Sequence, residues 1–334
     1  MPGTKSGFLR YLFTAIILAF PGSQLVIAQD NIPRTPWGKP DLNGIWDFHH
    51  LTPLQRPAEF GDKAVLTPEE AIAYEAGAFD REEARRARGS NFVGVDLWHE
   101  EAFAGWKMDK GRTSLILDPP SGRLPPIVES RQQELQAARA ERYRGPPRGP
   151  EDRSMAERCI VASQSVPPIK TLIENAILQI FQTPDHVAIH TERMHDSRII
   201  PLDHRAPLPS HIKQYMGSST GYWDGDTLVV ETTNIHPSYS YQNSSDELQV
   251  IERFTRVSTN ELLYEYTIND PLTFSQPWTA GYTMHKDKGP VIEYACHEHN
   301  YGLTGILSGA RADEARQAGK EFTIPFDYSS NNYN

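Results

Sequence analysis

Apolar and polar positions alternate with a period of two over most of the chain that follows Cys159. The clearest example is the stretch 221–234, GYWDGDTLVVETTN, in which a polar turn separates two short runs rich in aromatic and β-branched residues. Asp and Gly at 224–226 suit a tight type I′ turn, because both tolerate positive φ. The run 228–233 contains neither Gly nor Pro and is typical of a strand. This stretch therefore predicts a β-hairpin.

The same alternation predicts further strands, and short polar turns connect most of them. The predicted strands lie at residues 177–182, 186–193, 197–202, 219–223, 227–233, 248–257, 261–269, 278–286 and 291–298. Short connections require antiparallel neighbours, because parallel pairing needs long crossovers. A sheet of this size must close or stack to hide its edges. We therefore predict a mainly β protein with an antiparallel up-and-down, lipocalin-like barrel, and a β-sandwich is the alternative.

The region 29–150 has a different pattern. Prolines and isolated aromatics punctuate residues 29–66, which predicts an irregular arm packed on the barrel. Thr67-Pro68-Glu69-Glu70 combines an N-cap, a proline at the first helical position and a capping box, so a helix should run from there to about Arg88. A short strand at 112–118 and a surface helix at 129–143 should follow.

The breaker-rich segment GPPRGPEDR at 145–153 predicts a boundary near residue 150. The barrel domain should then cover 151–310, and a tail with a short helix should cover 311–334. Two or three helices are thus expected at the periphery of the β domain.

The first 28 residues are typical of a secretory signal peptide. Lys5 and Arg10 form a positively charged segment before the apolar run 11–20. Val26-Ile27-Ala28 resembles a small-residue cleavage site. The apolar run is too short for a stable membrane span. We therefore predict export to the periplasm or the medium with residues 1–28 removed, and a retained N-terminal anchor is the alternative.

Charge and cysteine content narrow the expected partners. The formal net charge is −10, and no periodic face collects Lys and Arg, which argues against nucleic acid and anionic membrane surfaces. A small organic molecule is the expected partner. The two cysteines, Cys159 and Cys296, favour a disulfide in an oxidising compartment, with two buried free thiols as the alternative.

Several phrases of the chain resemble a group of exported bacterial proteins that share the hairpin at 223–234. The phrases are PDLNGIW at 40–46, RTSL at 112–115, DPP at 118–120, ERC at 157–159, HDSRIIPLD at 195–203, WDGDTLVVETTN at 223–234, YACHE at 294–298 and NYG at 300–302. The resemblance implies one shared fold and a cysteine pair compatible with a disulfide, and it implies no activity. This chain has His299 where such proteins often have Gly.

Two segments concentrate the ionisable groups that can carry chemistry, HTERMHDSR at 190–198 and CHEHNY at 296–301. A disulfide between the cysteines would fix His297 and Glu298 at the rim of the barrel, and closure of the sheet would bring the segment 190–198 to the same rim. The predicted catalytic residues are His195, Asp196, Arg198, His297 and Glu298. They would supply an acid/base imidazole, a carboxylate that orients it and a guanidinium that holds an anionic group. The alternative is that these charges form structural pairs that close the barrel end.

A metal site is only weakly indicated. His297 and His299 are spaced to present two imidazoles to one metal ion, with His190 or Glu192 as the third ligand to test. The chain also lacks a Gly-x-Gly-x-x-Gly fingerprint, a phosphate-binding Gly-Lys-Ser/Thr loop and a Gly-x-Ser-x-Gly elbow. No cofactor is therefore expected.

Three functions fit these features. The leading hypothesis is a cofactor-free acid/base enzyme of the lyase, hydratase or isomerase type that acts on a small organic molecule. The second is a non-catalytic, lipocalin-like carrier of an apolar or aromatic ligand. The third is a structural module of the cell envelope. Polar groups that converge in a cavity would favour catalysis, and an apolar lining would favour carriage.

Overall fold

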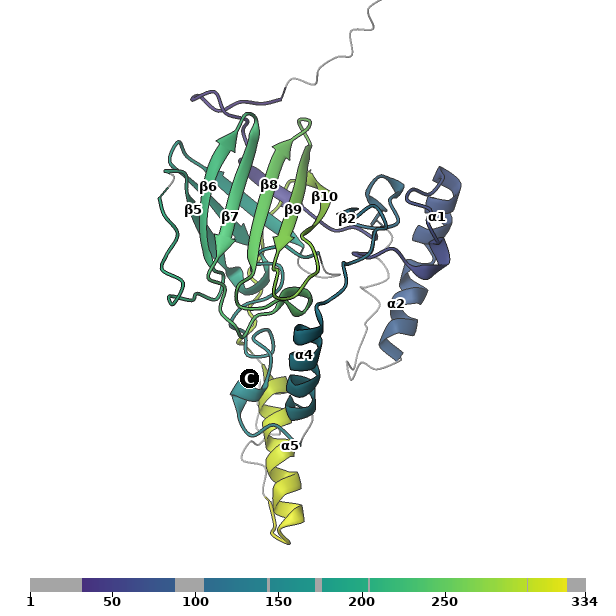
Figure 1. Ribbon diagram of the computed structural model, residues 1–334, viewed down its shortest axis with the longest axis vertical. Helices are drawn as coiled ribbons and strands as arrows, with labels where there is room; N and C mark the ends of the chain where they lie inside the picture. The colour runs from purple at the N-terminus through teal and green to yellow at the C-terminus, as the bar shows by residue number, and fades with distance from the viewer. Residues whose placement is uncertain are drawn as a thin grey trace, which may run out of the picture.

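An antiparallel sheet of ten strands dominates the computed structural model, which describes residues 32–87, 105–142, 145–171, 176–203, 205–298 and 300–322 (Figure 1). The predicted signal peptide lies outside these residues. Buried and partly buried side chains alternate along β8 and β9 with the period expected when one face of a sheet covers a core. The prediction of a mainly β, antiparallel fold is confirmed.

The order of the strands across the sheet is β5-β4-β3-β1-β10-β9-β8-β7-β6, and β2 pairs with β10 beside this path. The bounds are β1 Gly44–Asp47, β2 Ile116–Asp118, β3 Ile177–Gln182, β4 His186–Thr191, β5 Ser197–Pro201, β6 Ser218–Asp224, β7 Thr227–Thr233, β8 Gln249–Arg256, β9 Glu261–Asn269 and β10 Trp278–Asp287. Consecutive strands are neighbours from β3 to β5 and from β6 to β10, as in an up-and-down arrangement.

The sheet curls until its edge strands β5 and β6 approach each other (Figure 1). A Cβ atom at Gly221 of β6 would lie 3.0 Å from side-chain atoms of both Ile200 and Leu202, so glycine allows this close approach. Within the described part of the chain, no hydrogen-bonded ladder joins β5 to β6. The barrel is therefore open between β5 and β6. The fold can also be described as a β-sandwich made of its two facing halves.

The hairpin predicted at 221–234 is formed by β6 and β7, with Asp224 paired to Thr227 across a two-residue loop. Gly225 has a φ of 59°, whereas Asp226 does not have positive φ. A type I′ turn needs positive φ at both central residues, and a type II′ turn needs it at the first alone. The hairpin prediction is thus confirmed, and the turn matches type II′ where type I′ was expected.

Sequence reasoning missed β1 and wrongly predicted a strand at 291–298, which forms no regular structure. β1 takes the place beside β10 that a further C-terminal strand would need, with Trp46 opposite Lys286. It also pairs with β3 on its other side. Four residues are too few for alternation to reveal a strand, and Pro290 interrupts the chain directly before the predicted one.

The helices lie outside the sheet. They are α1 Pro68–Ala76, α2 Ala78–Ala87, α4 Glu129–Arg142 and α5 Tyr301–Gln317. The capping box of Thr67 and Glu70 starts α1 as predicted, but Gly77 divides the single expected helix in two, and the expected end near Arg88 lies outside the described residues. α4 and α5 project beyond one end of the sheet (Figure 1).

α5 begins well before the short tail helix that was expected after Ala310, so it crosses the predicted boundary at residue 310. The boundary near residue 150 stays a prediction. Among the described residues, no helix combines the length and the apolar character that a membrane crossing requires.

Aromatic side chains fill the core between the faces of the curled sheet. The largest fully buried ones are Trp46, Trp278, Tyr264, Tyr282, Phe48, Phe254 and Phe274. Tyr264 of β9 lies directly opposite Tyr282 of β10 in the ladder, with ring centroids 5.2 Å apart. Buried tyrosine hydroxyls need hydrogen-bond partners, so this core carries polar groups that must be satisfied internally.

Candidate functional site

A cavity of roughly 190 Å³ lies against the inner side of β9 and β10. Its lining residues are Thr52, Pro53, Leu54, Leu115, Ile169, Lys170, Thr171, Tyr241, Tyr266 and Tyr282. An apolar protein cavity of about 150 Å³ is large enough to bind benzene. The cavity can therefore hold one aromatic ring with small substituents, and it is smaller than the pockets of about 300–1,000 Å³ that hold larger ligands.

Two of the lining tyrosines come from strands, and the third comes from a loop. Alternation turns Tyr266 of β9 and Tyr282 of β10 inward, and both are buried. Tyr241 reaches them from the connection between β7 and β8, and its hydroxyl lies 2.9 Å from that of Tyr266. The Tyr241 ring meets the Tyr266 ring edge to face at 6.2 Å. Rings in such arrangements offer both faces and edges to a further aromatic ring.

The lining hydroxyls are neutral. Burial raises the pKa of Tyr241, Tyr266 and Tyr282 far above the usual value. They therefore act at neutral pH as hydrogen-bonding groups and not as bases. The hydroxyl of Tyr282 donates to the carbonyl oxygen of Ile169 at 2.8 Å, so its hydrogen is already in use.

Ile169, which forms part of the cavity wall, is held through both of its backbone groups. Its amide donates to the hydroxyl of Tyr264 at 2.8 Å, and its carbonyl accepts from Tyr282. The hydroxyl of Tyr264 donates in turn to Oε1 of Glu252 at 2.9 Å. Inward-facing side chains of β8, β9 and β10 thus fix the wall segment.

Arg198 forms a buried ion pair with Glu252 in the core that the curled sheet encloses. Its two terminal nitrogens lie 2.5 and 3.0 Å from the carboxylate oxygens. Burial acts to lower the pKa of Arg198, but the charge of Glu252 outweighs it and the pKa is raised. Arg198 reaches across the core from β5 to β8 and is not one of the cavity-lining residues.

The other predicted catalytic residues lie at the surface or near it. His195 is exposed in a short 3₁₀ turn between β4 and β5, beside Asp196, and its ring centroid is 4.5 Å from that of His190. His297 and Glu298 are exposed in the loop before α5. None of the five predicted catalytic residues lines the cavity. Their catalytic role stays a prediction.

The first predicted segment contacts the chain just before the second one, although about a hundred residues separate the two contact residues. The guanidinium of Arg193 lies over the ring of Tyr294, 4.5 Å from its centroid. Burial raises the pKa of the neighbouring Asp196, against a hydrogen bond from Ser165 that acts to lower it. Contact between the segments 195–198 and 297–298 stays a prediction, and the cavity lies elsewhere.

The weak metal candidates do not assemble into a site among the residues that the structure describes. There, no group of three His, Cys, Asp or Glu side chains is placed to hold a metal ion. Nδ1 of His190 lies 2.9 Å from the hydroxyl of Ser197, and Glu192 is buried. His299 lies outside the described residues, so its part in a site with His297 is not addressed.

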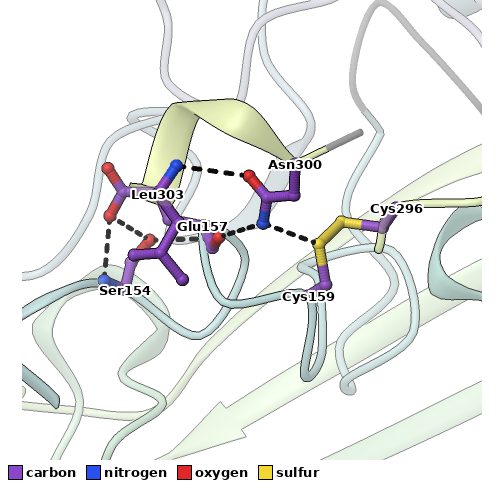
Figure 2. The surroundings of a disulfide bond; sticks show 6 residues. All are labelled: Ser154, Glu157, Cys159, Cys296, Asn300 and Leu303. Carbon is purple, nitrogen blue, oxygen red and sulfur yellow. Dashed lines mark hydrogen bonds between the residues drawn. A yellow bond between two sulfur atoms is a disulfide. The ribbon is translucent and has the colours of Figure 1, made fainter. Parts of the chain in front are cut away.

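The disulfide that was expected joins Cys159 and Cys296, with Cα atoms 5.6 Å apart (Figure 2). Asn300 supports it from the start of α5. Its amide nitrogen donates to the carbonyl of Glu157 at 2.9 Å and contacts Sγ of Cys159 at 3.3 Å, while its oxygen caps the helix. The disulfide therefore anchors α5 to the segment that leads into the cavity wall.

Part of the cavity was visible in the sequence. The aromatic content of the predicted strands indicates residues that could line a ring-binding cavity or simply form the core, namely Trp223, Trp278, Tyr264, Tyr266 and Tyr282. Of these, Tyr266 and Tyr282 line the cavity. The segments 52–54 and 169–171 were missed because each lies in a proline-punctuated loop without a periodic pattern. Tyr241 was missed for the same reason. No short motif could have revealed that these loops meet the sheet.

No protein-family model matches the chain, and no curated protein matches it. Among solved structures, the crystal structure of a secretary abundant heat soluble (SAHS) protein from Ramazzottius varieornatus matches with 16% sequence identity. The match has a TM-score of 0.23 and covers 33% of this chain and 70% of that chain. This likeness is too low for any inference about fold or function.

Proposed function

We propose that this chain is an exported, non-catalytic binding protein that holds a small molecule with a single ring in the tyrosine-lined cavity. The observation that carries the proposal is the lining itself. Three tyrosines and several apolar side chains form it, with no histidine and no carboxylate among the lining residues. Such a lining favours carriage over acid/base chemistry.

The same cavity can select its ligand by shape. Its volume suits a single ring, and the inward-facing tyrosines provide aromatic surface with little conformational freedom to lose on binding. The wall segment is held by Tyr264 and Tyr282 through Ile169, so the cavity is preformed. The signal-like N-terminus and the disulfide support a role in the periplasm or outside the cell.

The proposal is tested by filling the cavity. Leu115 lines it and is 5% exposed, whereas nearby Leu117 is 39% exposed and does not line it. We expect Leu115→Phe to weaken the binding of phenol-sized probes by about tenfold or more in calorimetric titrations, because the added ring takes up ligand space. Leu117→Phe is the matched control and should bind as the wild type does. Unchanged binding in a folded Leu115→Phe variant would overturn the proposal.

A second candidate function is the acid/base enzyme predicted from the sequence. The contact of Arg193 with Tyr294 favours it, because these two residues lie close along the chain to the segments 195–198 and 297–298. The raised pKa of Asp196 also suits a proton-transfer group. His297→Ala should then abolish turnover of the substrate and leave the binding of single-ring probes in the cavity unchanged. Turnover that survives this change would exclude the role of His297.

A further inference from the structure

A chain of hydrogen bonds links the buried ion pair of Arg198 and Glu252 to the cavity. Oε1 of Glu252 accepts from the hydroxyl of Tyr264 at 2.9 Å, and the oxygen of that hydroxyl accepts from the amide of Ile169 at 2.8 Å. All four residues are buried. Ile169 forms part of the cavity wall, whereas Arg198, Glu252 and Tyr264 are not among the lining residues. The chain therefore connects an ion pair in the core to one point of the wall.

This part of the wall depends on the sheet for its position. Residues 161–171 form neither helix nor strand, and both backbone hydrogen bonds of Ile169 go to tyrosines of the sheet, Tyr264 and Tyr282. A hydroxyl hydrogen rotates toward its acceptor, so Glu252 keeps a lone pair of the Tyr264 oxygen directed at the Ile169 amide. Buried hydrogen bonds in such a chain also strengthen one another. Glu252 thus acts on the wall without contact with the cavity.

Stability alone is a weak reason for a buried ion pair, because apolar residues of similar size often replace such a pair without loss of stability. From the chain of bonds we infer that Glu252 is a positioning residue of the ring-binding cavity, which acts through Tyr264 and Ile169. Arg198 holds the Glu252 carboxylate in place through two hydrogen bonds. This inference rests on the proposed function. A wall that is fixed before the ligand arrives loses little freedom on binding, so the affinity depends on groups that the ligand does not touch.

Two double variants without the ion pair test the inference. Arg198→Met/Glu252→Gln keeps a side-chain oxygen that can accept from Tyr264, whereas Arg198→Met/Glu252→Met has a side chain of similar length without an acceptor oxygen. In calorimetric titrations with phenol, we expect the first to bind within about threefold of the wild type and the second about tenfold more weakly. Tyr264→Phe, which removes only the hydroxyl, should also bind about tenfold more weakly. Hydrogen exchange at the Ile169 amide should be faster in the two weakened variants.

Arg253→Met/Asp224→Asn is the matched control, because it removes an exposed ion pair of the same sheet whose two residues do not line the cavity. It should bind phenol as the wild type does. Unchanged phenol affinity in a folded Tyr264→Phe variant, or equal phenol affinity of the two Arg198 double variants, would overturn the inference while the proposed function stands. A wild-type protein that binds neither phenol nor other neutral single-ring compounds would overturn the proposed function and the inference with it.

Discussion

His50 is a neutral histidine buried behind the cavity wall. Its ring lies 4.9 Å from that of Tyr282. Burial lowers the pKa of His50 to about 4, although the carboxylate of Asp109 acts to raise it. The folded protein therefore binds a proton at this site less readily than the unfolded chain does.

This difference predicts a loss of stability in acid. Between the unfolded pKa of about 6.5 and the folded value near 4, the unfolded state binds more protons, so stability falls as pH falls through this window. The loss attributable to His50 should approach about 3 kcal/mol at pH 4. Urea unfolding at pH 7 and pH 4.5 measures it. His50→Leu should reduce the pH dependence, and the exposed His186→Gln is the control. The same pH slope in His50→Leu and the wild type would refute this account.

Among the elements, the β6–β7 hairpin depends on one glycine. A Cβ atom at Gly225 would meet nothing within 4 Å, so the only obstacle to substitution is its φ of 59°. We expect Gly225→Val to lower the free energy of unfolding by about 1 kcal/mol or more. Gly145→Val is the control, since Gly145 also has open space around it but no positive φ. Equal thermal stability of the two variants would show that the turn does not need glycine.

The ion pair between Arg198 and Glu252 joins β5 to β8 and supports Tyr264. Removing one partner would leave a buried charge without compensation, so we expect Arg198→Met to cost about 3–5 kcal/mol. The double variant Arg198→Met/Glu252→Gln should recover much of that loss, because no buried charge remains. Arg253→Met, in an exposed pair with Asp224, is the control and should change little. A double variant as unstable as the single one, in urea unfolding, would contradict this reading.

At the scale of the whole molecule, the strands from β3 to β10 could be predicted because each shows alternation and is bounded by turn residues. The bounds of β3, β7 and β9 match the predicted ones. β1 could not be predicted, since its place between β3 and β10 is decided by pairing with segments distant in the chain. For the same reason, only part of the cavity lining could be predicted from the sequence. Strand periodicity marks Tyr266 and Tyr282, whereas tertiary packing alone places the loops that complete the wall.

The disulfide joins two segments of the chain that lie outside the sheet. Cys159 and Cys296 are 137 residues apart, and closing a loop of that size restricts the unfolded chain by about 5 kcal/mol in the entropy model. The bond leaves ten residues between Cys159 and the lining residue Lys170. Together with the hydrogen bonds to Ile169, it anchors the segment that walls the cavity.

The central claim is that the tyrosine-lined cavity binds a small single-ring molecule. Native mass spectrometry of the protein, purified without denaturation from the cells that produce it, tests this claim most directly. We predict a complex with one small molecule per chain, which is released on unfolding, contains one aromatic ring and is missing from the Leu115→Phe variant. A ligand-free wild-type protein that also binds no single-ring probe in titration, or a ligand that the Leu115→Phe variant retains equally well, would contradict it.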